Sequence, residues 1–317
     1  MNSILVFKNE TDIKDYDLSI VIPTFRNKKL LFSAIDSVIA LEKYEGISYE
    51  LLVVNNNPDD DMKELVDKYK KASIPVSFYK NVENYGQVGN INQGVSLSRG
   101  KYVAFLHDDD LLLPNYLNEI GPFIISGQKY DCIVASFYMM AENYSVDFKH
   151  RFLDVITSYR YLYRKKIQEI TPKDYVNSFY DVYSAPTCGT LFLKKAILDY
   201  GYFKDAHGAA WDYYNYRMFN KEKSVFLLHR YIGIRRTESG MSNEVKIQKE
   251  FLEDRKSMVE FEIGDNKFIK KYNPTFFTKR PIIKFIIFRI RTRLYYYSHN
   301  LDSTIGIPKK LFEIYRD

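Results

Sequence analysis

The sequence predicts an α/β protein built on a mostly parallel, doubly wound sheet that carries helices on both faces. Short runs of apolar and β-branched residues alternate four times with stretches whose apolar residues recur at the spacing of an α-helix. The connections between these runs are long enough to return the chain for parallel pairing. Polar residues follow the runs, and ligands bind at the carboxyl ends of the strands in such sheets.

The first half of the chain carries the clearest pattern. After a lead-in over residues 1–16, the first strand is closed by Pro23 at the sheet end, where its missing N–H does no harm. Apolar residues from Leu31 to Ile39 then recur at helical spacing. A turn-forming cluster, Asn55 to Asp59, ends the second strand. The expected elements are strand 18–23, helix 28–41, strand 49–54, helix 62–69, strand 76–79, helix 88–95 and strand 102–106.

The second half is expected to continue the sheet with shorter elements. Residues 139–185 differ from the rest because they are rich in Tyr, Arg and Lys and only weakly periodic. Two explanations of this composition are open, namely a solvated helix that packs its tyrosines inward, or a binding site for a second ligand, which the second half of such a fold commonly builds. From residue 243 the chain is predicted to be helical and highly charged. The expected elements are helix 115–125, strand 131–137, strand 191–193, a helix from Lys194, a helix that Asp212 caps, and strands 225–228 and 231–234.

Composition excludes several classes of protein. With 46% hydrophobic and 27% charged residues the chain is expected to be globular. Its formal charge of +6 is too mild and dispersed for a nucleic-acid binder. The two cysteines, Cys132 and Cys188, belong to no CxxC or Cys/His cluster in the sequence, which predicts no zinc site and favours a reducing cytosol. Residues 1–15 do not resemble a secretory signal, and no uncharged stretch is long enough to span a bilayer.

An acidic turn after the fourth strand is the strongest chemical signal. His107 and three consecutive carboxylates, Asp108 to Asp110, follow the apolar run that starts at Tyr102. Mutual repulsion makes such a trio costly, and a hard divalent cation such as Mg²⁺ or Mn²⁺ is the simplest reason for it. The alternative is a polar loop in which Asp110 caps a helix. Because strands 18–23 and 49–54 also end in polar residues, we expect three polar clusters at one rim of the sheet, as in a nucleotide or phosphate site.

A set of motifs resembles, in order and spacing, the family 2 inverting glycosyltransferases of GT-A fold, of the bacterial surface-polysaccharide type. The resemblance is close over residues 18–117 and weaker to about 240. It implies transfer of a sugar from a nucleoside diphosphate, UDP above all, to a hydroxyl of a glycan or lipid-linked oligosaccharide, with Mn²⁺ or Mg²⁺ as cofactor. The motifs are Leu18 to Phe25, Asn55 to Asn57, Asn84 to Gly86 with Asn92 to Gly94, and Phe105 to Pro114.

The resemblance assigns roles to individual residues. Asp109 would reach the metal together with Asp110, while Asp108 would lie near the ribose. Two positions depart from the family pattern, because Asn55 and His107 stand where aspartate is usual. An asparagine can still hydrogen-bond a base through its amide, and for His107 a structural role is favoured over metal ligation. The other donor-binding residues it implies are Pro23, Thr24, Phe25, Asn56, Asn84, Asn92, Arg235 and Arg236.

The acceptor side rests on fewer matches. Asp212 would be the general base, although a helix N-cap is its ordinary role, and Trp211 replaces the family's usual Glu. Trp211 would stack on a sugar ring or belong to the core. The turn with Gly189 and Thr190 resembles the family's loop beneath the acceptor. Arg235 and Arg236 would neutralise the diphosphate, or form a solvated basic loop.

We expect residues 1–242 to form a GT-A catalytic domain, with a nucleotide-sugar half at 17–120 and an acceptor half at 121–242. Residues 243–317 would be a basic, aromatic helical extension. Within it, 279–297 suits a membrane-surface helix, or else packs on the catalytic domain or on a second subunit as in a homo-oligomer. These features predict a cytoplasmic protein, peripheral at the inner face of the membrane. A nucleotidyltransferase and a non-catalytic nucleotide- or glycan-binding relative are the alternatives.

Overall fold

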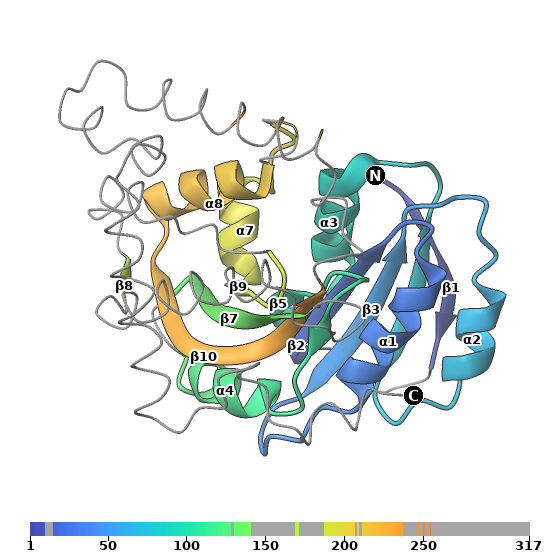
Figure 1. Ribbon diagram of the computed structural model, residues 1–317, viewed down its shortest axis with the longest axis horizontal. Helices are drawn as coiled ribbons and strands as arrows, with labels where there is room; N and C mark the ends of the chain where they lie inside the picture. The colour runs from blue at the N-terminus through green and yellow to red at the C-terminus, as the bar shows by residue number, and fades with distance from the viewer. Residues whose placement is uncertain are drawn as a thin grey trace, which may run out of the picture.

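A computed structural model places most of the first half of the chain and parts of the second (Figure 1). Its elements form a mixed sheet with helices on both faces, which confirms the predicted fold class. The residues that the structure describes are 1–9, 15–127, 130–140, 169–170, 187–206, 208, 211–236, 246, 250 and 254.

The elements follow one another in the predicted alternation of strand and helix. They are β1 (Ser3–Lys8), β2 (Tyr16–Thr24), α1 (Lys28–Ile39), β3 (Tyr49–Asn55), α2 (Lys63–Tyr69), β4 (Val76–Asn81), α3 (Gly86–Leu97), β5 (Gly100–Phe105), β6 (Leu111–Leu112), α4 (Tyr116–Ile125), β7 (Cys132–Met140), β8 (Glu169–Ile170), β9 (Leu191–Leu193), α7 (Lys194–Tyr200), α8 (Trp211–Glu222) and β10 (Val225–Arg236).

The order of the strands creates a switch point at the centre of the sheet. The sheet runs β1-β4-β3-β2-β5-β9-β7-β10-β6, and β8 pairs with β10. Strands β4, β3, β2 and β5 are parallel neighbours. The chain therefore winds outward from β2 through β3 to β4, then returns to place β5 on the other side of β2. Ligands bind at such reversals, outside the carboxyl ends of the strands.

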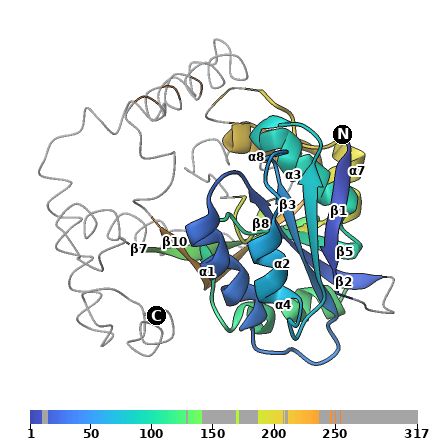
Figure 2. The ribbon, with the colours of Figure 1, turned by 90° about the vertical axis from the view of Figure 1, so that its right-hand side faces the viewer.

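Alternation along β2 builds one core on each face of the sheet. Leu18, Ile20 and Ile22 lie in the core cluster that α1, α2 and α4 cover. Val21 points to the opposite cluster, which is formed with α3, α7 and α8. Figure 2 shows α1 and α2 on one side and α3 and α8 toward the other. Burial on both faces explains why the central strands read as continuous apolar runs.

Two segments differ from the sequence prediction. Residues 1–16 were expected to be a lead-in, but Ser3–Lys8 forms an edge strand antiparallel to β4, with a register shift between Leu5 and Phe7. The strands expected at 225–228 and 231–234 are one strand, β10, which pairs in parallel with β7. Its register shifts near Tyr231 keep the pairing continuous through the polar residues that suggested a break.

Several predictions fall outside the described residues. These include most of the 139–185 region, and all of the proposed surface helix at 279–297. In the part of the chain that the structure describes, no helix has both the length and the apolar character required to cross a bilayer.

Candidate functional site

The carboxyl ends of β2, β3 and β5 are joined by hydrogen bonds at the switch point. The Thr24 hydroxyl donates to Asp108 Oδ2 over 2.6 Å, and Asn27 Nδ2 donates to Asp108 Oδ1 over 3.2 Å. The backbone N–H of Asn56 donates to the Thr24 carbonyl over 2.9 Å. The polar ends of the three strands therefore meet at one rim, as the sequence predicted.

Asp108 is a carboxylate that the fold keeps under electrostatic strain. Burial raises its pKa to about 6, and the neighbouring Asp109 charge acts in the same direction. The hydrogen bonds from Thr24, Asn27 and the Phe25 backbone act to lower the pKa but do not cancel the burial. A rim that concentrates negative charge in this way suits a bound cation.

The three aspartates have different surroundings. Asp109 is half-buried, whereas Asp110 is 1% exposed. Asp110 Oδ1 accepts the backbone N–H of Arg236 over 3.0 Å, and Arg236 Nη1 donates to the Asp109 carbonyl over 3.1 Å. The Asp110 N–H closes a turn onto the His107 carbonyl. Asp110 is followed by β6, and Asn115 precedes α4, so Asp110 does not cap that helix.

Arg235 and Arg236 end a strand and do not form a solvated loop. Strand β6, which begins directly after Asp110, pairs antiparallel with β10 through Leu111 and Ile234. This pairing carries the last residues of β10 to the acidic turn. Both arginines are half-buried there. Their placement beside the turn is what a role in binding a diphosphate requires.

Asn55 and Asn56 hold the turn after β3 through internal hydrogen bonds. Asn55 Nδ2 donates to Asp60 Oδ2 over 3.1 Å, and Asn55 Oδ1 accepts the Asn57 N–H over 2.9 Å. Asn56 Nδ2 donates to Asn84 Oδ1 over 2.6 Å, and Asn56 Oδ1 accepts from Asn81 Nδ2 over 2.9 Å. These amides shape the rim, so any contact they make with a base must use their remaining donor and acceptor capacity.

Asn92 does not face the rim as a donor-binding residue should. It is 8% exposed, and its amide exchanges two hydrogen bonds with the backbone of Phe203, at 2.8 and 3.0 Å. Both polar ends of the side chain are thereby used to anchor the segment that precedes α8. The structure assigns Asn92 to packing between α3 and that segment, which corrects the expectation from the resemblance.

An open hollow beside the rim was not predicted in detail from the sequence. Its volume is about 510 Å³. Arg26, which lines the hollow, places its guanidinium 4.9 Å from the ring centroid of Phe25, a side chain that is 42% exposed. The one sequence signal for this hollow was the run of three aspartates, Asp59 to Asp61, shortly after Asn55. The hollow is lined by Arg26, Lys28, Asn57, Asp59, Asp60 and Asp61.

Trp211 lies in the core. It is 6% exposed, its ring packs edge-on against Phe203 at 6.5 Å, and its indole N–H donates to Gln87 Oε1 over 3.1 Å. Trp211 was expected either to stack on a sugar or to belong to the core, and its burial supports the core role. Because Gln87 belongs to the first turn of α3, this bond also brings the start of α8 to the carboxyl-end side of the sheet (Figure 2).

Asp212, next to Trp211, is the second residue of α8 and half-buried. It was expected to precede the helix as an N-cap, but the helix already begins at Trp211. An acidic side chain in a first helical turn is favoured by the helix dipole. Its role as a base remains a prediction.

Gly189 and Thr190 are buried, so they could support an acceptor site only by packing under it and not by direct contact with the acceptor. Gly189 has φ +69°, and an added Cβ would lie 2.4 Å from Phe137 Cζ. Thr190 is 1% exposed. The Gly189 carbonyl accepts the Tyr116 hydroxyl over 3.4 Å. The turn therefore needs glycine for both backbone conformation and space.

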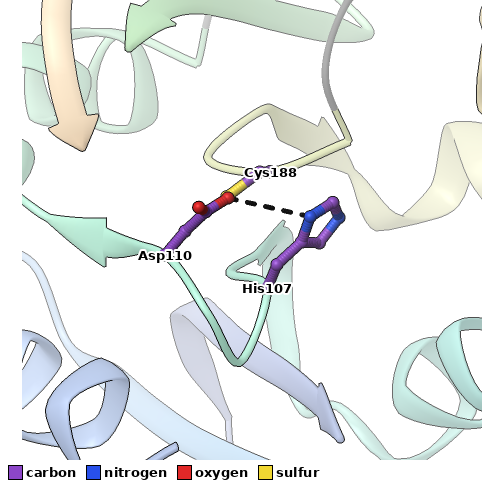
Figure 3. A group of neighbouring side chains, drawn as sticks. All are labelled: His107, Asp110 and Cys188. Atoms are coloured by element: carbon purple, nitrogen blue, oxygen red, sulfur yellow. Dashed lines mark ion pairs between the residues drawn. The ribbon is translucent and has the colours of Figure 1, made fainter. Parts of the chain in front are cut away.

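Cys188 precedes this turn and contacts the acidic residues. Its thiol, the His107 imidazole and the Asp110 carboxylate form one cluster, with ligand atoms within 4.8 Å of one another (Figure 3). The sequence predicted no Cys/His cluster, because the residues are far apart along the chain. An isolated bridge that pairs Cys188 with Phe105 brings them together. Burial lowers the pKa of His107 to about 4, so its imidazole is neutral.

Known structures share the fold of this chain. The crystal structure of residues 1–349 of TarS from S. aureus aligns with a TM-score of 0.52 at 17% identity, covering 81% of this chain and 77% of that one. A mannosyltransferase, PcManGT from Pyrobaculum calidifontis, solved with GDP-Man and Mn²⁺, aligns with a TM-score of 0.53 at 12% identity, covering 80% and 66%. The fold is that of the GT-A glycosyltransferases.

The sequence profile of Glycosyl transferase family 2 matches residues 19–187, more than half of the chain. The chain therefore belongs to this family.

Curated relatives are similar over the donor half. The GalNAc(5)-diNAcBac-PP-undecaprenol beta-1,3-glucosyltransferase of Campylobacter jejuni is 34% identical over 105 residues, which is 32% of this chain and 33% of that protein. The uncharacterized glycosyltransferase MJ1057 of Methanocaldococcus jannaschii is 27% identical over 128 residues, 40% of this chain and 43% of that protein. The matched part spans less than half of either relative.

Proposed function

We propose that this glycosyltransferase moves a sugar from a UDP-linked donor to a hydroxyl of a glycan or lipid-linked oligosaccharide, in the synthesis of a surface polysaccharide. The observation that carries the proposal is the bond of Asp108 to Thr24 at the switch point, with Asp109 beside it. Crystals of TarS with UDP and with UDP-GlcNAc support the choice of nucleotide. The undecaprenol-linked substrate in the C. jejuni relative's name supports the acceptor class and work at a membrane surface.

The residues at the rim fit a hard divalent cation. Asp109 lies between two carboxyl groups, Asp108 and Asp110, whose pKa values are raised by burial and by the Asp109 charge, and it is less buried than Asp110. Asp109 would therefore bind Mn²⁺ or Mg²⁺, and Asp110 would support the site from the buried side of the turn. When bound, the cation would stabilise the leaving diphosphate by Lewis acidity. A cation would also relieve the repulsion among the three aspartates.

The remaining roles belong to side chains of the chain itself. Asp108 would accept a hydrogen bond from a ribose hydroxyl, while Thr24 and Asn27 fix the orientation of the Asp108 carboxylate. Arg235 and Arg236, at the end of β10, would neutralise diphosphate oxygens. Asp212 would accept the proton of the attacking acceptor hydroxyl as the new bond forms, and inversion follows from attack opposite the leaving group. The hollow beside Phe25 would receive the nucleobase.

Measuring UDP release with and without an acceptor, in the wild type, Asp212→Asn and Asp109→Asn, tests the proposal. We expect Asp212→Asn to retain UDP-dependent thermal stabilisation and to lose transfer by at least about 10²-fold. Asp109→Asn should lose both, because its cation holds the donor. A sugar-nucleotide panel scored by melting temperature with Mn²⁺ and with chelator identifies the donor.

Two results would reject the proposal. Nucleotide binding without any turnover would favour the alternative of a non-catalytic relative. Stronger stabilisation by GDP-sugars than by UDP-sugars would overturn the choice of nucleotide while leaving the reaction class. The match to Glycosyl transferase family 2 argues against the nucleotidyltransferase alternative.

A further inference from the structure

The cluster of His107, Asp110 and Cys188 has the donor set of a transition-metal site. It offers one imidazole nitrogen, one carboxylate oxygen and one thiol sulfur. Hard cations such as Mg²⁺ and Mn²⁺ prefer oxygen ligands, whereas thiolate with imidazole favours Zn²⁺. The cluster therefore differs in chemistry from the half-buried carboxylate of Asp109.

The spacing within the cluster suits a single ion. Metal–ligand bonds of 2.0–2.3 Å in tetrahedral geometry place ligand atoms roughly 3.3–3.8 Å apart. His107 Nδ1 and Asp110 Oδ2 are separated by 3.7 Å, and all three ligand atoms lie within 4.8 Å of one another. Figure 3 shows both side chains turned toward the Cys188 sulfur. A contraction of about 1 Å, within reach of side-chain rotation, would bring the three ligand atoms to bonding distance, and a water molecule would supply the fourth ligand of a tetrahedral ion.

One polar atom of the cluster is poorly satisfied. Asp110 is 1% exposed, and its Oδ2 meets no hydrogen-bond donor among the described residues apart from the Cys188 thiol, which is a weak donor. His107 presents Nδ1 to this oxygen, whereas its Nε2 lies on the far side of the ring (Figure 3). A buried carboxylate oxygen without a strong hydrogen bond costs the fold free energy, and a ligand is one of the reasons for which proteins retain such an atom.

The local charges balance when an ion is bound. A divalent ion displaces the thiol proton of Cys188 to solvent, so that a thiolate and the Asp110 carboxylate face it, with His107 neutral. Asp109 and Arg235, which both act electrostatically on the cluster, contribute opposite charges. The formal sum of these groups with one divalent ion is zero.

We propose that His107, Asp110 and Cys188 bind a structural Zn²⁺ ion that fixes the acidic turn to the segment before β9. Two chain segments would be tied at this point, since Cys188 already bridges to Phe105 at the end of β5. The ion would hold Asp110, and leave Asp109 to the catalytic cation. Fixing the turn would preset the position of Asp108 against Thr24.

The test uses Co²⁺ as a spectroscopic substitute for Zn²⁺ in the full-length protein after removal of metals. Thiolate ligation produces a charge-transfer band in the near ultraviolet. The chain has two cysteines, and Cys132, also buried but outside the cluster, supplies the matched control. We expect the band in the wild type and in Cys132→Ser, but not in Cys188→Ser. Retention of the band in Cys132→Ser assigns it to Cys188 even if Cys188→Ser fails to fold.

Zinc content and stability provide the second measurement. We expect one equivalent of Zn²⁺ in the wild type and in Cys132→Ser, with affinity reduced at least about tenfold in Cys188→Ser and His107→Ala. Zn²⁺ should raise the melting temperature of the first pair, and an equal concentration of Mn²⁺ should not replace it. Absence of the cobalt band in Cys132→Ser, or Zn²⁺ affinity unchanged in Cys188→Ser, overturns the proposal. None of these readouts depends on sugar transfer.

Discussion

Replacing Asp108 with asparagine should make the protein more stable while impairing donor binding. The folded protein raises the pKa of this carboxyl from 3.8 to about 6, chiefly through burial. At about 1.4 kcal/mol per pKa unit, holding Asp108 ionised costs up to about 3 kcal/mol. Asp108 is partly exposed, so solvent screening reduces this, and about 1–2 kcal/mol is expected. Asparagine can keep both hydrogen bonds, because the Thr24 hydroxyl can accept as well as donate.

The gain should depend on pH with a defined sign. Well below pH 3.8 the carboxyl is protonated in both the folded and the unfolded chain, so the raised pKa costs no stability there. As the pH rises through 3.8 toward 6 the unfolded chain releases its proton first, and the wild type progressively loses stability. Asparagine does not titrate. The stability difference between Asp108→Asn and wild type should therefore be small near pH 4 and reach its full value above pH 7.

Urea unfolding at pH 4 and pH 8, with chelator and without nucleotide, measures this difference. Asp59→Asn, which removes an exposed carboxylate from the neighbouring loop, controls for the change in net charge. In the presence of Mn²⁺ and a UDP-sugar the order should reverse, because only the wild type gains from the ligands. If Asp108→Asn is less stable than wild type at pH 8, or its effect is the same at both pH values, the electrostatic account of the rim is wrong.

Three further substitutions test the frame around the site. Gly189→Ala should cost about 2–4 kcal/mol in urea unfolding, because φ is +69° and the new Cβ would meet Phe137; unchanged stability would contradict this crowding. Glu50→Gln should cost about 2–3 kcal/mol by removing the carboxylate charge that binds the Arg99 guanidinium at the amino end of the sheet, with nucleotide affinity of the folded protein unaltered. Asn90→Ala removes hydrogen bonds to carbonyls at the ends of β2 and β3, so it should lower both stability, by about 1–3 kcal/mol, and UDP affinity; loss of stability alone would show that the rim does not need it.

The fold was predictable where burial leaves a pattern that sequence alone reveals. β2, β3 and β5 are covered on both faces, so they appear as apolar runs that end in polar residues. β1 gives no such signal, because Ile4 and Leu5 are 53% and 50% exposed and the strand exists through its pairing with β4. For β10, polar residues interrupted the apolar pattern, whereas pairing with β7 continued across them.

The site was predictable in its position but only partly in its residues. Asp108 and Thr24 meet because parallel strands fix where their ends lie. Asn92 was misassigned and Trp211 was left open between two roles, because motif position does not tell whether a side chain faces the rim or the core, and both are buried. The contact of Cys188 with His107 depends on pairing between distant segments, which no local pattern encodes.

Adjacent aspartates can serve different purposes because the turn separates their environments. The bond from the Asp110 N–H to the His107 carbonyl folds the chain back, so that Asp108 faces Thr24 while Asp110 turns inward to the Arg236 N–H. Burial raises the pKa of Asp108 to about 6 and that of Asp110 to about 7, so each carboxylate costs stability when ionised. A purely structural turn would gain from asparagine at either position. Retaining charge at a destabilising site is explained when a cation binds there, because the ligand recovers free energy that the empty fold has lost.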